Sequence, residues 1–282
     1  MPELPEVQTI VNDLNSAGLT GCRITGARVF WPRTIAEPSP GAFCRRIKGK
    51  QFTAIDRRGK YLVFPVDDGA TLLIHQRMSG HLNLVRTNTP RTKHEHVVIR
   101  FADGRQLRFH DPRKFGRLQL VADPAIILNR LGPEPLSSGF TASVLASRLK
   151  KRRRLLKPLL LDQTFIAGLG NIYVDEALWE ARLHPCRQAC GLAAPEIKAL
   201  HRAIRRVLKR GLKNLGTSLG TGKANFYSVS RRRGRNSDQL NVFRRAGLAC
   251  PRCQSPIERI IVGQRGTHLC TKCQRVVPGL PR

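Results

Sequence analysis

The chain has 282 residues, of which 50 are lysine or arginine and 19 are aspartate or glutamate, giving a formal net charge of +31. Its hydrophobic fraction of 41% is too high for a disordered basic tail, and no segment approaches the roughly 20 apolar residues of a membrane span. The N-terminus lacks a secretion signal, so we expect a cytoplasmic protein without membrane contact. The charge predicts a polyanionic partner, with nucleic acid the first candidate.

The first predicted element is a helix from about Pro5 to Leu14. Its apolar residues fall at positions i, i+3, i+4 and i+7: Val7, Ile10, Val11 and Leu14. This spacing places them on one face, as in an amphipathic helix, and proline suits the first turn.

From about Ile24 to Val121 the apolar residues recur at every second position, as in half-buried strands. The stretches YLVF and TLLI flank an Asp68-Gly69 turn, while HVVIRF and QLRFH flank Asp103-Gly104. Glycine supplies the positive φ that such turns need, so each pair is predicted to form a hairpin. We expect an antiparallel β-sandwich with the N-terminal helix attached.

Helices are predicted after a linker at 131–139, where two prolines and two glycines interrupt the periodicity. Thr141 is a candidate cap for a helix that reaches KKRRRLL, a second helix covers Asp175–Arg182, and a third covers 197–212. The third carries cations and no carboxylate after Glu196: Lys198, Arg202, Arg205, Arg206, Lys209, Arg210 and Lys213. Such a face is either simply solvated or contacts phosphate, and the lack of acids favours phosphate.

Four cysteines near the C-terminus form the pattern Cys250-x2-Cys253 and Cys270-x2-Cys273, with sixteen residues between the pairs. This spacing is typical of a zinc ribbon, in which a hairpin joins two knuckles. Two disulfides are the alternative, which a reducing compartment disfavours. Four thiolates leave no open position for water, so the predicted zinc ion is structural.

The opening sequence MPELPE places Pro2 behind the initiator methionine, so removal of Met1 leaves a secondary amine at the N-terminus. An α-amine titrates at about 7.7–8.0 and is partly nucleophilic near neutral pH. Its attack on an aldehyde-like carbon gives an iminium ion, an electron sink that weakens neighbouring C–H and C–O bonds. Glu3 and Glu6 are candidates for proton transfer. An ordinary helix start, made by Pro5 and Glu6, is the competing explanation.

Seven motifs occur in one order along the chain: MPELPEV, RRGKYL, HQRMSG, DPRKFG, LGPEPL, LLLDQTFIAGLGNIYVDEALWEARLHP and the CxxC pairs. Together they resemble the formamidopyrimidine-DNA glycosylase family. The resemblance implies an α+β multidomain fold with an N-terminal antiparallel β-sandwich and N-terminal helix (1–130). A helix-two-turn-helix domain (131–240) with a base-capping loop (216–240) and a C-terminal zinc-ribbon hairpin (241–282) are implied to follow.

Because the sequence shows no evident apolar interface, we expect a monomer. The resemblance also implies a bacterial protein that acts on double-stranded DNA with oxidised bases or abasic sites. It would be a base-excision-repair glycosylase for oxidised purines, such as 8-oxoguanine and formamidopyrimidines, with an AP lyase that performs β,δ-elimination. Pro2 is implied to attack C1′, with Glu3 as general acid/base and Glu6 as supporting carboxylate. Lys60 is implied to hold the backbone at the lesion, and Lys157 to face the same region.

The resemblance assigns eight residues to DNA binding: His75, Met78, Arg113, Phe115, Lys157, Asn171, Glu176 and Arg265. Met78, Arg113 and Phe115 would fill the space left by an extruded nucleotide. Core packing is the alternative for Met78 and Phe115. Asn171 and Arg265 would grip the phosphates beside the lesion, although the glycines before Asn171 are equally compatible with a simple turn.

The base-capping loop departs from the family pattern, because an arginine cluster occupies part of 216–240. Two other functions therefore stay open. One is an endonuclease VIII-like glycosylase for oxidised pyrimidines, which resembles this chain less because it lacks the Met, Arg and Phe triad. The other is a non-catalytic DNA-binding zinc protein, which needs neither Pro2 nor Glu3.

Overall fold

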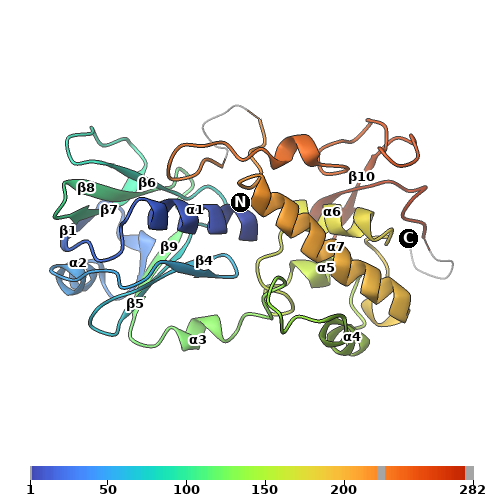
Figure 1. Ribbon diagram of the computed structural model, residues 1–282, viewed down its shortest axis with the longest axis horizontal. Helices are drawn as coiled ribbons and strands as arrows, with labels where there is room; N and C mark the ends of the chain where they lie inside the picture. The colour runs from blue at the N-terminus through green and yellow to red at the C-terminus, as the bar shows by residue number, and fades with distance from the viewer. Residues whose placement is uncertain (1, 221–225, 277–282) are drawn as a thin grey trace. The chain divides into compact units, whose positions relative to one another are not determined.

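Two β-sheets dominate the N-terminal part of the computed structural model, which describes residues 2–220 and 226–276 (Figure 1). The first sheet has the strand order β1 (Ile24–Val29), β7 (Glu95–Phe101), β8 (Arg105–His110) and β6 (His81–Arg86). The second has the order β2 (Ile35–Glu37), β9 (Arg117–Val121), β5 (Thr71–His75), β4 (Tyr61–Pro65) and β3 (Asp56–Arg58). Three helices belong to this part of the chain: α1 (Leu4–Ser16), η1 (Pro32–Thr34) and α2 (Pro40–Ile47).

Both predicted hairpins are confirmed. Strands β4 and β5 pair antiparallel around Gly69, and β7 and β8 pair antiparallel around Gly104. Both glycines have positive φ, 85° and 78°, as their turns require. One pairing departs from the antiparallel pattern, because the short strand β2 runs parallel to β9.

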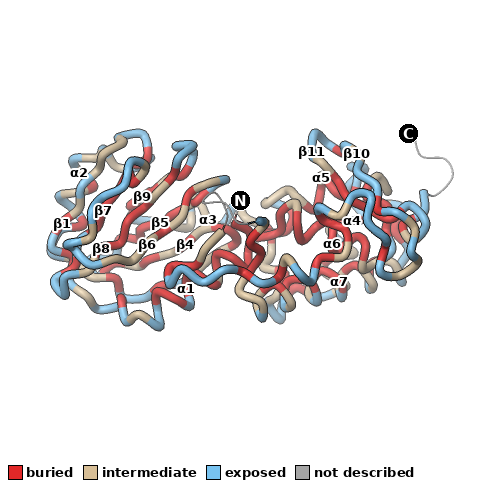
Figure 2. The backbone as a smooth tube through the Cα atoms, turned by 90° about the horizontal axis from the view of Figure 1, so that it is seen from above, coloured by how far each residue is buried: buried red, intermediate tan, exposed pale blue. Residues whose placement is uncertain are grey.

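The hydrophobic core of this part lies between the sheets and against α1. The four apolar residues predicted to share one helical face are all buried: Val7, Ile10, Val11 and Leu14. They belong to the same cluster as Leu62 and Ile74 of the second sheet and Ile99 and Phe109 of the first. Buried positions consequently alternate with partly or fully exposed ones along β1 and β4, whereas β5, β7 and β8 are buried along most of their length (Figure 2).

Helices dominate the remainder of the chain, which ends in a β-hairpin. Its helices are α3 (Ala125–Leu128), α4 (Ala142–Lys150), α5 (Leu156–Leu161), α6 (Asn171–Glu180), η2 (Ala189–Gly191), α7 (Ala194–Lys213) and η3 (Asn236–Gln239). The hairpin consists of β10 (Glu258–Val262) and β11 (Arg265–Leu269). Thr141 caps α4 as predicted, since its hydroxyl accepts a 3.2 Å hydrogen bond from the Val144 N–H. Helix α6 begins earlier than predicted, at Asn171.

The chain divides into two units. Unit 1 comprises Met1–Asn129 and Leu212–Arg235, and unit 2 comprises Arg130–Gly211 and Asn236–Arg282. Most of the predicted base-capping loop thus belongs to the same unit as the β-sandwich. The boundaries 1–130, 131–240 and 241–282 stay a prediction. Among the described residues, no helix is long and apolar enough to cross a membrane.

Candidate functional site

The start of α1, with Glu3 as its N-cap and Glu6 in its first turn, holds both predicted carboxylates in the interior of unit 1. Glu3 is 2% exposed and Glu6 is 1% exposed, and Pro2 is buried just before the helix. Glu6 Oε2 accepts a 2.8 Å hydrogen bond from the Glu3 N–H, as expected of a helix start. Its Oε1 accepts a 2.7 Å bond from the N–H of Thr217, far along the chain. Glu6 therefore joins the N-terminus to the base of the 216–240 loop.

Two glycines allow the loop to lie this close to Glu6. Gly216 has a φ of 82°, and a Cβ there would lie 2.8 Å from both Cγ and Oε1 of Glu6. A Cβ on Gly234 would lie 2.4 Å from the carbonyl oxygen of Gly216. Any larger residue would therefore push the base of the loop away from Glu6.

The far half of the loop is anchored to the same helix by Asp13, a residue that sequence reasoning missed. Asp13 is buried, accepts a 2.9 Å hydrogen bond from the Ser230 N–H, and forms an ion pair with Arg232. Burial raises the pKa of Asp13, but hydrogen bonds from Ser228, Ser230 and Arg232 outweigh it and lower the pKa overall. One arginine of the inserted cluster is thus used to hold the loop on α1.

Lys60 and His75 lie near each other at one end of the paired strands β4 and β5, since Lys60 directly precedes Tyr61, the partner of His75. Lys60 is 5% exposed in the β3–β4 turn, and the rings of His75 and its cross-strand neighbour Tyr61 have centroids 4.7 Å apart. Burial, aided by the positive charges of Arg77 and Lys60, lowers the pKa of His75 to about 3. The Arg77 N–H donates to Nδ1 at 3.0 Å, so the neutral ring carries its proton on Nε2 and is a donor there.

The three predicted void-filling residues stand on two loops of unit 1 with their side chains in solvent. Met78 is 44% exposed on the β5–β6 loop, and Phe115 is 46% exposed on the β8–β9 loop. Arg113, also exposed, places its guanidinium carbon 4.9 Å from the centre of the Phe115 ring. Core packing is therefore excluded for Met78 and Phe115. An exposed methionine and an exposed aromatic ring are instead available for contact with a ligand.

A buried carboxylate, Asp111, connects these two loops. It is fully enclosed, and its Oδ1 accepts hydrogen bonds from the Ser79 hydroxyl at 2.5 Å and the Arg113 N–H at 3.2 Å. Its Oδ2 accepts from the Gly116 N–H at 2.7 Å. Sequence reasoning missed this residue, although an aspartate that opens DPRKFG is a common turn former. Asp111 fixes the loop next to Met78 against the loop that carries Arg113.

Both loops also close over one aromatic ring. A Cβ on Gly80 would lie 2.7 Å from Cζ of Phe109, and a Cβ on Gly116 would lie 2.3 Å from the same atom. Such distances are below van der Waals contact, so each loop requires glycine at this point. The wedge formed by Met78, Arg113 and Phe115 thus stands on a tightly packed base.

In unit 2 the predicted DNA-contacting residues meet at the hairpin. Asn171, at the start of α6, donates a 3.0 Å hydrogen bond from Nδ2 to the carbonyl of Gly266, the residue after Arg265. Lys157 Nζ donates to the same carbonyl at 3.1 Å and forms a 2.6 Å ion pair with Asp175. Arg265 itself is exposed. The structure therefore docks the hairpin that presents Arg265 onto α5 and α6.

Lys157, which the resemblance implies to face the lesion, lies in the interior of unit 2. Its side chain is completely buried, and so is that of Asp175, whose second oxygen accepts a 2.9 Å hydrogen bond from the His268 N–H. An enclosed ammonium that is paired with a carboxylate holds elements together rather than reaching out to a phosphate. The sequence identifies Lys157 as a cation, but it does not show that Asp175 is its buried partner.

Glu176 connects several elements of unit 2 through its hydrogen bonds. It is 1% exposed, and its Oε1 accepts hydrogen bonds from the N–H groups of Val242 at 2.9 Å and Phe243 at 3.0 Å. Oε2 accepts from the side-chain amide of Asn241 at 2.9 Å and from Arg210 at 3.2 Å. The carboxylate ties α6 to α7 and to the segment that leads into the zinc region.

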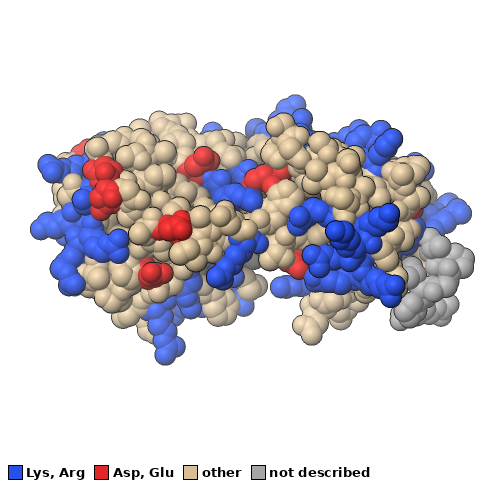
Figure 3. Space-filling view, turned by 90° about the horizontal axis from the view of Figure 1, so that it is seen from below, with Lys and Arg blue, Asp and Glu red and all other residues tan. Residues whose placement is uncertain are grey.

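The basic face of α7 is only partly available to phosphate, which corrects the prediction. Arg205 donates to the backbone carbonyls of Pro135 and Ser137, Arg206 pairs with Glu180, and Arg210 pairs with Glu176. These arginines hold unit 2 together. The molecule nevertheless presents many more basic than acidic side chains on the face shown in Figure 3.

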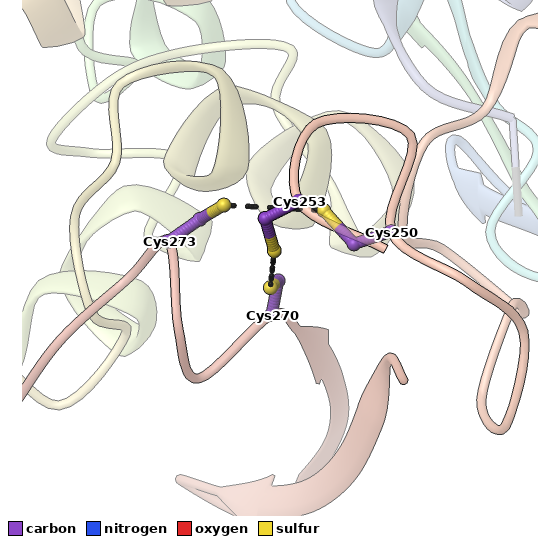
Figure 4. A group of neighbouring side chains, drawn as sticks. All are labelled: Cys250, Cys253, Cys270 and Cys273. Atoms are coloured by element: carbon purple, nitrogen blue, oxygen red, sulfur yellow. Dashed lines mark hydrogen bonds between the residues drawn. The ribbon is translucent and has the colours of Figure 1, made fainter. Parts of the chain in front are cut away.

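Four cysteines form a candidate metal centre in unit 2. The sulfur atoms of Cys250, Cys253, Cys270 and Cys273 all lie within 4.8 Å of one another and point to one centre (Figure 4). Trp179 Nε1 donates a hydrogen bond to the Cys250 sulfur at 3.4 Å, which favours its thiolate form. A closed set of four thiolates fits one structural zinc ion. The β10–β11 hairpin joins the two cysteine pairs, as predicted.

Three family models match the chain in the order of these sites. They are the formamidopyrimidine-DNA glycosylase N-terminal domain at residues 1–118, the formamidopyrimidine-DNA glycosylase H2TH domain at 131–222, and the zinc finger found in FPG and IleRS at 247–276. The chain is 47% identical to the formamidopyrimidine-DNA glycosylase of Protochlamydia amoebophila, covering 98% of this chain and 100% of the relative. It is 46% identical to that of Roseiflexus sp., with 98% and 100% covered.

Solved structures agree with the sequence matches. A Lactococcus lactis FPG mutant in complex with Fapy-dG-containing DNA is similar with a TM-score of 0.91 and 36% identity, covering 98% of this chain and 100% of that one. The Lactococcus lactis Fpg complex with abasic-site DNA gives a TM-score of 0.89 and 35% identity, covering 97% and 100%. With the buried carboxylates, the exposed wedge and the four-cysteine centre in place, this chain belongs to the formamidopyrimidine-DNA glycosylase family.

Proposed function

We propose that this chain removes oxidised purines from double-stranded DNA and cleaves the strand at the resulting abasic site, as a step of base excision repair. The observation that carries the proposal is the exposed wedge of Met78, Arg113 and Phe115 in the same unit as Pro2 and the buried carboxylates. An enzyme that works on C1′ must extrude the nucleotide and fill the space it leaves. Relatives named formamidopyrimidine-DNA glycosylase, and a solved complex of such a protein with Fapy-dG-containing DNA, support this proposal.

The reaction follows from an unprotonated prolyl amine. After Met1 is removed, the nitrogen of Pro2 forms a bond to C1′ while the glycosidic bond breaks, and the departing base takes up a proton. Ring opening of the sugar gives an iminium ion between Pro2 and C1′. Loss of a C2′ proton then expels the 3′ phosphate, and a second elimination expels the 5′ phosphate, so the strand is left with a gap. Water finally hydrolyses the iminium bond, which releases the sugar remnant as an aldehyde and restores the amine of Pro2.

Different side chains are proposed to carry out the proton transfers and to position the DNA backbone. Glu3 is the proposed acid and base, as the family resemblance implies. Glu6, which accepts hydrogen bonds from the N–H groups of Glu3 and Thr217, is proposed to support it. Lys60 and His75 are proposed to hold the backbone phosphate at the lesion. The neutral ring of His75 would act as a hydrogen-bond donor through Nε2.

Unit 2 is proposed to hold the flanking phosphates with Arg265, Asn171 and the N-terminus of α6. One zinc ion, held by the four cysteines, would stabilise the hairpin that carries Arg265 and take no part in the reaction. Lys157 and Glu176 would act through this arrangement rather than by touching DNA. We propose that the protein works as a monomer in the bacterial cytoplasm.

The choice between purine and pyrimidine lesions has a direct test. Matched duplexes would carry either one 8-oxoguanine or one oxidised pyrimidine, and excision would be measured under single-turnover conditions. We expect faster release of the purine, because the Met, Arg and Phe wedge is the one associated with the purine enzymes. Preferential release of the pyrimidine would show instead an endonuclease VIII-like enzyme.

A further inference from the structure

A groove on the outer face of the first sheet takes no part in the site described above. It has a volume of about 480 Å³ and lies entirely within unit 1. Its lining includes an aromatic ring, Phe30, and four guanidinium groups: Arg28, Arg91, Arg100 and Arg108. Four arginines in one groove are more than solubility alone requires, and they indicate a candidate site for an anion.

The strand register explains why the arginines gather there. Val97 and Ile99 of β7 point into the core, so Val98 and Arg100 point to the outer face. Val98 lies opposite Arg28 of β1 on one side and opposite Arg108 of β8 on the other. The groove therefore has an apolar floor at Val98 with basic side chains around it.

Arg108 builds a wall of the groove rather than binding a ligand. Its guanidinium forms a buried ion pair with Glu95 at 3.1 Å and donates to the side chain of Gln106 at 2.9 Å. It also donates to the backbone carbonyls of Thr89 at 2.6 Å and Pro90 at 3.0 Å. These bonds fix the β6–β7 loop beside the sheet, and they cancel the charge of both Arg108 and Glu95.

The other three arginines keep their charge. In the part of the chain that the structure describes, neither Arg28, Arg91 nor Arg100 forms an ion pair with a carboxylate, and all three are exposed. The guanidinium carbons of Arg28 and Arg91 lie 4.9 and 4.1 Å from the centre of the same ring, that of Phe30. Three uncompensated cations around one groove favour an anionic ligand with several charges.

We propose that this groove binds backbone phosphates of DNA outside the lesion, as a second DNA contact of unit 1. Arginine suits this role because its planar guanidinium donates two parallel hydrogen bonds to a phosphate. Arg28 and Arg100 come from neighbouring strands in diagonal positions, about 7–8 Å apart at their Cα atoms, which suits an extended anion better than a compact one. DNA is named as the anion because of the proposed function.

The test compares two variants that each lose two positive charges from unit 1. Arg28→Ala/Arg100→Ala removes two cations of the groove, and Arg45→Ala/Arg46→Ala removes two exposed cations from α2, outside it. The affinity of the zinc-loaded protein for an undamaged duplex is measured across a series of salt concentrations. Each lost phosphate contact reduces the magnitude of the slope of log affinity against log salt by about 0.9. We therefore expect this magnitude to fall by about 1.8 for the groove variant and to stay unchanged for the α2 variant.

A further variant, Arg28→Lys/Arg100→Lys, keeps the charge and is expected to keep most of the slope. If the groove variant has the same slope as the wild type or as the α2 variant, the proposal is overturned. It is also overturned if Arg28 and Arg100 are needed for binding a polyglutamate peptide but not DNA. Because undamaged DNA is used, this result is independent of excision: a chain without glycosylase activity can still show the groove effect.

Discussion

The two units use buried charge in different ways. In unit 1 the buried carboxylates Glu6 and Asp111 receive hydrogen bonds from loops, and Met78, Arg113 and Phe115, on the two loops that Asp111 connects, stand exposed. In unit 2 two of the predicted DNA-binding residues, Lys157 and Glu176, are themselves buried, and Arg265 is exposed on a hairpin that they help to hold. A charged residue in a DNA-binding motif can therefore affect DNA binding indirectly, by positioning the element that contacts the DNA.

Removal of the zinc ion would have the largest effect, and it would be confined to unit 2. In Cys253→Ser the closed set of four thiolates is lost, and a structural zinc site contributes on the order of 10 kcal/mol to folding of its domain. We expect loss of zinc and of specific DNA binding. Bound zinc per chain and DNA affinity are the measurements, with Cys190→Ser, which lies outside the cluster, as the matched control.

The corresponding change in unit 1 is Asp111→Ala. It leaves the donors of Ser79, Arg113 and Gly116 without their acceptor, at a cost of about 1–3 kcal/mol for each donor that stays buried. We expect excision of a paired lesion to fall more than cleavage at a preformed abasic site, because an unpaired nucleotide is easier to extrude. Equal losses on both substrates would indicate general destabilisation and contradict the proposed positioning role. Asp67→Asn, exposed in the β4–β5 turn, is the control.

A comparison of Met78→Ala with Leu82→Ala tests whether Met78 belongs to the exposed wedge or to the hydrophobic core. Met78 is 44% exposed, so its truncation should change the free energy of unfolding by less than about 0.5 kcal/mol. Leu82 is 2% exposed, and its truncation should cost about 2–5 kcal/mol. We expect Met78→Ala to slow excision without destabilising the protein. A stability loss as large as that of Leu82→Ala would show that Met78 belongs to the core.

Acid should destabilise the folded chain through its buried histidines, a smaller effect. Burial lowers the pKa of His75 to about 3 and that of His110 to about 4, from an ordinary value of 6.5. Between these values and 6.5 the unfolded chain binds protons that the folded chain does not. The free energy of unfolding should therefore be highest above pH 6.5 and fall as the pH drops toward 4.

Denaturant titrations across this pH range test the prediction. A His110→Gln variant should lose part of the dependence, since Gln does not titrate. An unfolding free energy that stays constant or rises as the pH falls from 6.5 to 4 would contradict the assigned pKa shifts.

Local patterns were sufficient for much of this structure. The apolar face of α1, the glycine turns at Gly69 and Gly104, and the two cysteine pairs each depend on residues close in sequence. The roles of Asp111 and Asp13 depend instead on partners far along the chain, such as Ser79 and Ser230, and no local period marks them. The contacts of the arginines of α7 could not be predicted for the same reason, because their partners, such as Glu176 and Glu180, are brought close only by tertiary packing.

The central claim is that the amine of Pro2 becomes covalently bound to C1′ of a damaged nucleotide. It is tested most directly by incubating the zinc-loaded protein, with removal of Met1 verified by intact mass, with abasic-site DNA in the presence of borohydride. We predict a stable protein–DNA adduct whose linkage maps to Pro2. Failure of the folded, processed protein to form any adduct would contradict the claim and leave a non-catalytic DNA-binding protein in its place.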